Sequence, residues 1–329
     1  MGSVFCVAAG FSPPVSKRIA MIKVRMTAII TLLAGIWIEL APLQQPRQEL
    51  AVAAANGKIY AIGGISGMAV LSSVEEYDPT ANRWRFVAPL PEPLHHSAAA
   101  TVGDFIYVIG GYRTLAFDPT NSVYRYDSRT DLWSRVASLP SPRGALAAST
   151  IDGRIYAVGG NPDGTDLTAY DPLTDRWTML QPMPTAREHL AAAAAGGKLY
   201  VAGGRQPQNV GAFEVYDPAL DRWNALAALP TARSGIAATF VNSRIYVFGG
   251  EGNLSSSTGV FAETESYDIV AGIWRTEMPM FTPRHGIGAA TIGDRIYIPG
   301  GAVLQGFGAT NANDAFVAVV PQRRRAVRP

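Results

Sequence analysis

The sequence predicts an all-β fold in which six four-stranded sheets surround one axis, a six-bladed β-propeller. The first observation behind this prediction is a glycine pair that recurs every 44 to 51 residues, at Gly63-Gly64, Gly110-Gly111, Gly159-Gly160, Gly203-Gly204, Gly249-Gly250 and Gly300-Gly301. The second is that a tryptophan precedes each pair by 26 residues, at Trp37, Trp84, Trp133, Trp177, Trp223 and Trp274. The third is a short alternating apolar segment, such as RIYAV, directly before each pair. An offset kept six times indicates a repeat array, and repeats of this length are typical of propellers.

Each complete repeat is predicted to contain four strands in a fixed order. The first strand is rich in small residues (AVAAA, SAAAT, LAAST, LAAAAA, IAAT, IGAAT), as expected where six strands converge on an axis and bulky side chains would collide. The second strand alternates (KIYAI, FIYVI, RIYAV, KLYVA, RIYVF, RIYIP) and should be a packed middle strand. The third ends in Tyr-Asp, whose Asp begins a turn. The fourth carries the Trp, which should pack between sheets.

The repeat array is incomplete at both of its ends. The last repeat has a third strand near Phe316–Val319 but no Trp after it, whereas Trp37 stands before the first complete repeat. We therefore expect residues 33–40 to supply the fourth strand of the last sheet. Such a closure would remove an open sheet edge.

These residues resemble the kelch family, whose repeats carry a double glycine, a Tyr-Asp-Pro-like turn and a spaced Trp. The resemblance covers roughly Gly35 to Val320. It implies a six-bladed propeller with four antiparallel strands per blade, in a stand-alone, prokaryotic-type kelch repeat protein. Kelch propellers serve many functions, so the activity must be argued from a site.

The segments flanking the repeats are predicted to be separate from the propeller, which should span residues 33–320. Residues 1–32 form an extension that is disordered or signal-like, and residues 321–329 form a basic disordered tail. Met21–Gly35 combines a basic run with an uncharged stretch too short for a membrane span of ~20 residues. This pattern suits an export signal, but Trp37 sits in the repeat register and no clean cleavage site precedes it. A cytoplasmic location is therefore favoured over secretion, with the signal left as the alternative.

Charge and cysteine content exclude several classes of function. Eight of the 28 Lys and Arg residues lie in residues 1–25 or after Pro321, which leaves 20 against 26 acidic residues in the rest of the chain. The propeller is thus net acidic, which argues against nucleic-acid binding. Cys6 is the only cysteine and lies outside the repeats, so no disulfide, cysteine-based zinc site or thiol nucleophile is expected. We predict a monomer without cofactor, metal or membrane span.

One position in each repeat carries a recurring charge. Sixteen residues before the glycine pairs stand Arg47, Leu94, Arg143, Arg187, Arg233 and Arg284. In kelch adaptors that capture acidic peptides, arginines at this position point into the central cavity, so the resemblance implies a carboxylate-binding ring here. The alternative is that each Arg ties neighbouring blades together through Glu75, Glu214 or Glu265. Leu94 interrupts the ring in either case.

All four histidines follow that Arg position by one or two residues, at His95, His96, His189 and His285. Glu49 and Glu188 occupy the same two positions. A solvated polar rim, ligand contact and metal binding all suit such a cluster. Strand alternation predicts that His95 and His285 face the opposite side from His96 and His189.

The sequence predicts a non-catalytic binding scaffold that recognises a protein, an acidic peptide or a small anion through the loop face around the channel. The five arginines and four histidines are the candidate binding residues. The alternative is a carbohydrate-active enzyme of the mutarotase or epimerase kind, since the kelch resemblance includes sialic acid epimerases. No nucleophile elbow or phosphate loop appears in the sequence.

Overall fold

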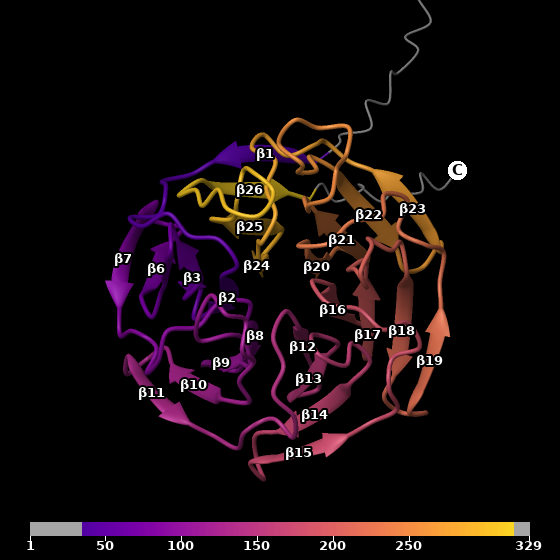
Figure 1. Cartoon of the computed structure of the whole chain (residues 1–329), viewed down its shortest axis with the longest axis horizontal. Helices are drawn as coiled ribbons and strands as arrows, with labels where there is room; N and C mark the ends of the chain where they lie inside the picture. Colours follow the sequence, from indigo (N-terminus) through magenta and orange to yellow (C-terminus); the bar gives the residue numbers. More distant parts are fainter. Residues whose placement is uncertain (1–34, 319–329) are drawn as a thin grey trace, which may run out of the picture. The chain divides into compact units, whose positions relative to one another are not determined.

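A computed structural model of the chain describes residues 35–318, which form strands and loops and no helix. Six four-stranded antiparallel sheets, here called blades, stand around a central axis (Figure 1). This arrangement confirms the predicted six-bladed propeller. The extension at 1–32 and the tail at 321–329 lie outside the described residues. Within 35–318, no helix is long and apolar enough to cross a membrane.

The blades are numbered 1 to 6 in the order of their first strands along the chain. Each is built from four strand positions, counted outward from the axis. The first strands are β2 (Ala51–Ala55), β8 (Ala98–Val102), β12 (Ala147–Ile151), β16 (Ala191–Ala195), β20 (Ala237–Val241) and β24 (Ala290–Ile292). The second strands are β3 (Lys58–Ile62), β9 (Phe105–Ile109), β13 (Arg154–Val158), β17 (Lys198–Ala202), β21 (Arg244–Phe248) and β25 (Arg295–Pro299). The third strands are β6 (Val74–Asp78), β10 (Val123–Asp127), β14 (Leu167–Asp171), β18 (Phe213–Asp217), β22 (Thr264–Asp268) and β26 (Asn313–Val317).

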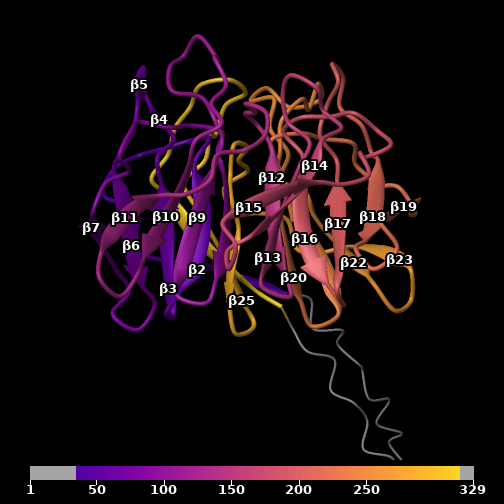
Figure 2. The same ribbon diagram turned by 90° about the horizontal axis from the view of Figure 1, so that it is seen from below.

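The fourth strands form the outer rim. They are β7 (Arg83–Val87), β11 (Leu132–Arg135), β15 (Arg176–Met179), β19 (Arg222–Ala225), β23 (Ile273–Thr276) and β1 (Ile36–Glu39). A further two-stranded hairpin, β4 (Ile65–Ser66) with β5 (Ala69–Val70), lies in the loop between the second and third strands of blade 1. Loops in this position project from one end of the propeller, at the top of Figure 2. We call this end the loop face.

Blade 6 confirms the predicted closure, because its strand order is β1-β26-β25-β24. Trp37 pairs with Phe316 in the antiparallel register and is only 5% exposed. Its indole Nε1 donates to the carbonyl of Met278 in blade 5 at 2.9 Å. The N-terminal strand therefore completes the last sheet and fastens it to the blade before it.

The tryptophans and glycine pairs join successive blades. Every Trp indole donates to a backbone carbonyl on the segment that follows the preceding fourth strand, at 2.7–2.9 Å. The first glycine of a pair lies against the next blade: a Cβ at Gly159 would lie 2.8 Å from the Arg187 carbonyl oxygen. The second, Gly160, has a φ of +93°, a conformation that L side chains rarely adopt.

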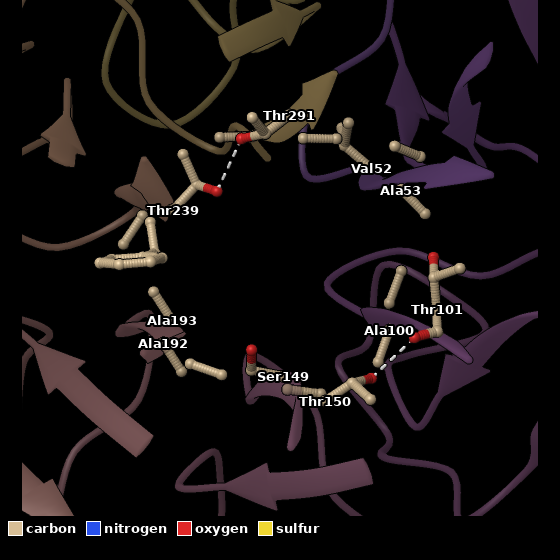
Figure 3. Close-up of a pocket in the computed structure, with 18 residues that line it drawn as sticks. Val52, Ala53, Ala100, Thr101, Ser149, Thr150, Ala192, Ala193, Thr239 and Thr291 are labelled. Carbon is tan, nitrogen blue, oxygen red and sulfur yellow. Dashed lines mark hydrogen bonds between the residues drawn. The ribbon is translucent and has the colours of Figure 1, made fainter. Parts of the chain in front are cut away.

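The first strands line a channel along the axis, as the small residues predicted. One part of it encloses about 310 Å³ and is lined by alanines and a few Ser, Thr, Val and Phe side chains (Figure 3). Thr150 donates to the Thr101 carbonyl, and Thr239 bonds Thr291, so these hydroxyls are partnered within the wall. None of the described residues that line this part of the channel is charged. The candidate chemistry lies nearer the loop face.

Candidate ligand-binding site

The five arginines lie inside the blades, which corrects the expectation of a carboxylate-binding ring. Arg47, Arg143, Arg187, Arg233 and Arg284 are each 0% exposed. Arg187 donates to Glu214 at 2.6 Å and to the carbonyls of Thr185 and Val201. Arg47 donates to Glu75 at 2.8 Å, Arg233 to Glu265, and Arg284 pairs with Asp314 at 2.9 Å. Burial lowers the pKa of all five, and neighbouring acids act against that shift. No ligand can reach guanidinium groups enclosed in this way.

The predicted partners Glu75, Glu214 and Glu265 are correct, but the side-chain pairs lie within one blade rather than between blades. Each acid is the second residue of the third strand in the blade that its Arg precedes. Neighbouring blades are joined by the backbone of the Arg position, because its carbonyl accepts from the second glycine of the preceding pair. Where Leu94 replaces Arg, Tyr124 replaces the acid. Both partners of the buried pair therefore change together in blade 2.

Two residues after the Arg position, the backbone forms a ring around the channel near the loop face. The residues there are Glu49, His96, Ala145, His189, Gly235 and Gly286, and all have φ between 52° and 64°. The N–H of each donates to the carbonyl of the equivalent residue in the preceding blade at 2.8–2.9 Å, and Glu49 donates to Gly286. Six hydrogen bonds thus form a closed ring around the axis. We call it the backbone ring.

A cavity of about 230 Å³ lies between the backbone ring and the loops of the loop face. Polar side chains supply most of its lining: Gln48, Glu49, His96, His189, Arg205, Glu251, His285 and Gln305. Ile65, Gly306 and the phenylalanines Phe117 and Phe307, which are 42% and 50% exposed, complete it. We call this space the central cavity. It is the candidate site because acids, imidazoles and a guanidinium converge there.

His95 and His96 form one hydrogen-bonded unit. Nε2 of His95 lies 2.9 Å from the Thr114 carbonyl, which can only accept, so this nitrogen carries a hydrogen. Nδ1 of His95 lies 2.6 Å from Nδ1 of His96 and accepts from it when His95 is neutral. His96 thereby directs Nε2 toward Glu49 Oε2, 3.3 Å away. Burial lowers the pKa of His96 to about 3.

His285 is held between two carboxylates. Its Nε2 donates to the Leu304 carbonyl at 2.9 Å, while Nδ1 lies 3.5 Å from both Glu49 and Glu251. Burial disfavours the charged ring, but the two acids outweigh burial and raise the pKa of His285. Burial likewise opposes ionisation of Glu49, yet its histidine neighbours hold the pKa of this carboxyl well below its usual range. Glu49 is therefore an ionised acid at the base of the cavity.

His189, Glu188 and Arg205 form a second hydrogen-bonded group, of which His189 and Arg205 line the cavity. His189 Nδ1 lies 2.8 Å from Glu188 Oε2, and Arg205 Nε donates to Glu188 Oε1 at 2.7 Å. Arg205 also pairs with Glu251 at 2.5 Å, and its Nη2 lies 3.4 Å from both ring nitrogens of His189. Burial raises the pKa of Glu188, but His189 and Arg205 together lower it to about 2. Arg205 is thus neutralised by two acids.

The structure brings all four histidines to the cavity region, against the prediction that they face opposite sides. The prediction assumed strand alternation, which fails because His96 and His189 have φ of 54° and 52°. Sequence reasoning also missed Arg205 and Glu251. Each directly follows a glycine pair, and each bridges to the residue after the Arg position, Glu188 and Ser234 respectively. A charged residue directly after a glycine pair is the signal that would have identified them.

The comparisons with known proteins agree with the fold. A family model described as the KLHDC2/KLHL20/DRC7 Kelch-repeats domain matches residues 36–160 and 88–250, and a Kelch motif model matches residues 232–281. Kelch-like protein 33 of Homo sapiens is 47% identical over 49 residues, 15% of this chain and 9% of that protein. The F-box/kelch-repeat protein At5g26960 of Arabidopsis thaliana is 48% identical over 44 residues, 13% of this chain and 11% of that protein. The matched segments thus span about a tenth of these relatives.

Among solved structures, the structure of YjhT aligns with a TM-score of 0.70 over 83% of this chain and 95% of that chain. The two sequences are 17% identical in this alignment, so the likeness shows a shared fold. The first family model alone spans residues 36–250, more than half of the chain. This protein belongs to the kelch-repeat family, with its six repeats closed into one propeller.

Proposed function

We propose that this kelch propeller is a binding scaffold that recognises a protein segment across the loop face, with the central cavity receiving one polar side chain. The observation that carries the proposal is the placement of exposed apolar side chains. Met68, Phe117, Leu254, Leu304 and Phe307 are 77%, 42%, 99%, 48% and 50% exposed. All five lie on loops between second and third strands, which share the loop face (Figure 2). Exposed apolar surface rimming a polar centre is typical of protein-binding sites.

The size of the central cavity supports a side chain as its occupant. Its volume, about 230 Å³, lies below the roughly 300–1,000 Å³ usual for pockets that enclose drug-sized ligands. The charge of the cavity also limits the occupant. Glu49, Glu188 and Glu251 outnumber Arg205, and the five other arginines are enclosed in the blades. A neutral or basic residue suits the metal-free cavity better than the acidic ligand that the arginine pattern suggested.

A peptide-library selection against the full-length protein tests this proposal. We expect enriched peptides to share apolar residues around one neutral or basic polar residue, and to lose at least tenfold in affinity when Leu254→Ser and Phe307→Ser are combined. Leu173→Ser is the matched control, because Leu173 is 96% exposed but lies in a turn between third and fourth strands, at the opposite end. Enrichment of acidic peptides, or equal loss of affinity in the control, would count against the loop face as the site.

A second function, sugar mutarotation or epimerisation, is favoured by the paired acids and imidazoles. His96 with Glu49 and His189 with Glu188 place two potential proton donors or acceptors at one small cavity. If the protein is such an enzyme, it should accelerate exchange between sugar anomers measured by NMR, and His189→Ala should abolish the acceleration. A panel of aldoses and sialic acids that shows only the uncatalysed rate would remove this candidate.

A further inference from the structure

The base of the central cavity holds three side chains arranged as ligands of a metal ion. One donor atom each from Glu49, His96 and His189 can be chosen so that all lie within 4.8 Å of one another. Metal–ligand bonds of about 2.1 Å in a tetrahedral site separate donors by roughly 3.4 Å. His96 Nε2 and Glu49 Oε2 are already 3.3 Å apart, which is the spacing of two ligands of one ion.

Hydrogen bonds to neighbouring groups leave Nε2 of His189 and of His96 as the nitrogens that can bind the metal ion. His189 donates Nδ1–H to Glu188 at 2.8 Å, which leaves Nε2, 3.4 Å from Arg205 Nη2, as the nitrogen that can bind a metal. His96 donates Nδ1–H to His95, which in turn donates to the Thr114 carbonyl. Metal-binding histidines almost always use their second nitrogen in this way, with a carboxylate or another acceptor behind the ring. Each imidazole is therefore oriented by a hydrogen bond from its Nδ1.

A bound cation would satisfy the contact between His96 and Glu49. In the neutral tautomer fixed by His95, His96 Nε2 is an acceptor, and it faces an acceptor oxygen of Glu49 at 3.3 Å. A positive ion between the two atoms converts this repulsion into two ligand bonds. The surrounding charge is also favourable, because the three carboxylates of Glu49, Glu188 and Glu251 outnumber the guanidinium of Arg205 even together with a protonated His285.

We propose that Glu49, His96 and His189 bind one divalent transition-metal ion of the zinc class at the base of the central cavity. Two imidazoles among three ligands favour zinc, cobalt or nickel over magnesium and calcium, which prefer oxygen. Three protein ligands leave a coordination position open toward the cavity, as in sites that exchange ligands rather than purely structural ones. The proposal replaces the expectation of a metal-free protein, and it does not depend on the identity of any partner.

The test uses the untagged full-length protein, stripped of metal with EDTA and titrated with Zn²⁺ and Co²⁺. Calorimetry and elemental analysis should give one ion per chain, and bound Co²⁺ should show visible ligand-field absorption. Glu49→Gln, His96→Gln and His189→Gln should each weaken binding at least 100-fold. Glu188→Gln, which removes the negative charge behind His189 and weakens the pair with Arg205, should weaken it about 10–100-fold. Glu92→Gln is the control: this carboxylate pairs with Arg113 away from the cavity and should leave binding unchanged.

Urea unfolding in EDTA shows whether each variant folds. If a ligand variant does not fold, Glu188→Gln still decides the question, because it leaves all three ligands in place. Absence of stoichiometric binding of Zn²⁺, Co²⁺ and Ni²⁺ would overturn the proposal and indicate a proton between His96 and Glu49. Wild-type affinity in His96→Gln, His189→Gln and Glu188→Gln would overturn it as well, since the ion would then lie elsewhere.

Discussion

At the scale of single residues, the buried arginine pairs determine stability rather than ligand binding. Arg187→Met should lower the free energy of unfolding by about 3–5 kcal/mol, because it leaves Glu214 buried without its partner. Adding Glu214→Leu should recover most of that loss. Arg154→Met, at an exposed pair with Asp171, should cost only about 0–1 kcal/mol. Urea denaturation measures all three. A stable Arg187→Met protein that binds its ligand poorly would instead return this residue to the binding site.

The sequence predicted which residues recur but not always where their side chains point. The spacing located all five arginines, and three acids were predicted because a buried ion pair requires both partners at fixed positions in the blade. Arg143 instead donates to Thr168 at the position of the acids. A cavity-facing Arg and a blade-facing Arg use the same position in the repeat, so spacing alone left both arrangements open. In blade 2, Leu94 stands in place of the Arg and Tyr124 in place of its acid. This joint replacement distinguishes the two arrangements only once Tyr124 is known to occupy the position of the acids.

At the scale of strands and loops, regular elements were predictable and the segments joining blades were not. Small residues at β2, β8, β12, β16, β20 and β24 predicted the inner strands, because crowding at the axis leaves little choice of side chain. The expected strand at 33–40 is β1 at Ile36–Glu39, and the expected third strand near Phe316–Val319 is β26 at Asn313–Val317. The backbone ring escaped prediction because residues other than glycine, such as Glu49 and Ala145, adopt positive φ there.

At the scale of the whole propeller, stability depends on closing the ring. In a linear repeat array the two end repeats have one neighbour each. Here every blade contacts two others, and β1 supplies the outer strand of the last sheet. Trp37 makes one of the six indole hydrogen bonds that join successive blades. It also belongs to the apolar cluster that contains Phe248 and Phe316. Blade 6 therefore couples the two ends of the repeat array, and the loss of β1 should lower the stability of all six blades.

Removing residues 1–40 should open the ring, and removing only residues 1–34 is the matched control because it spares β1. Without β1, β26 becomes an unprotected edge strand and the site filled by Trp37 is empty, so we expect a lower urea midpoint and self-association. Size-exclusion chromatography and Trp fluorescence measure both effects. A synthetic peptide of residues 34–42 should restore part of the midpoint by pairing with the exposed edge. If the protein lacking residues 1–40 stays monomeric with the midpoint of the control, closure by β1 contributes little and the remaining strands hold the propeller unaided.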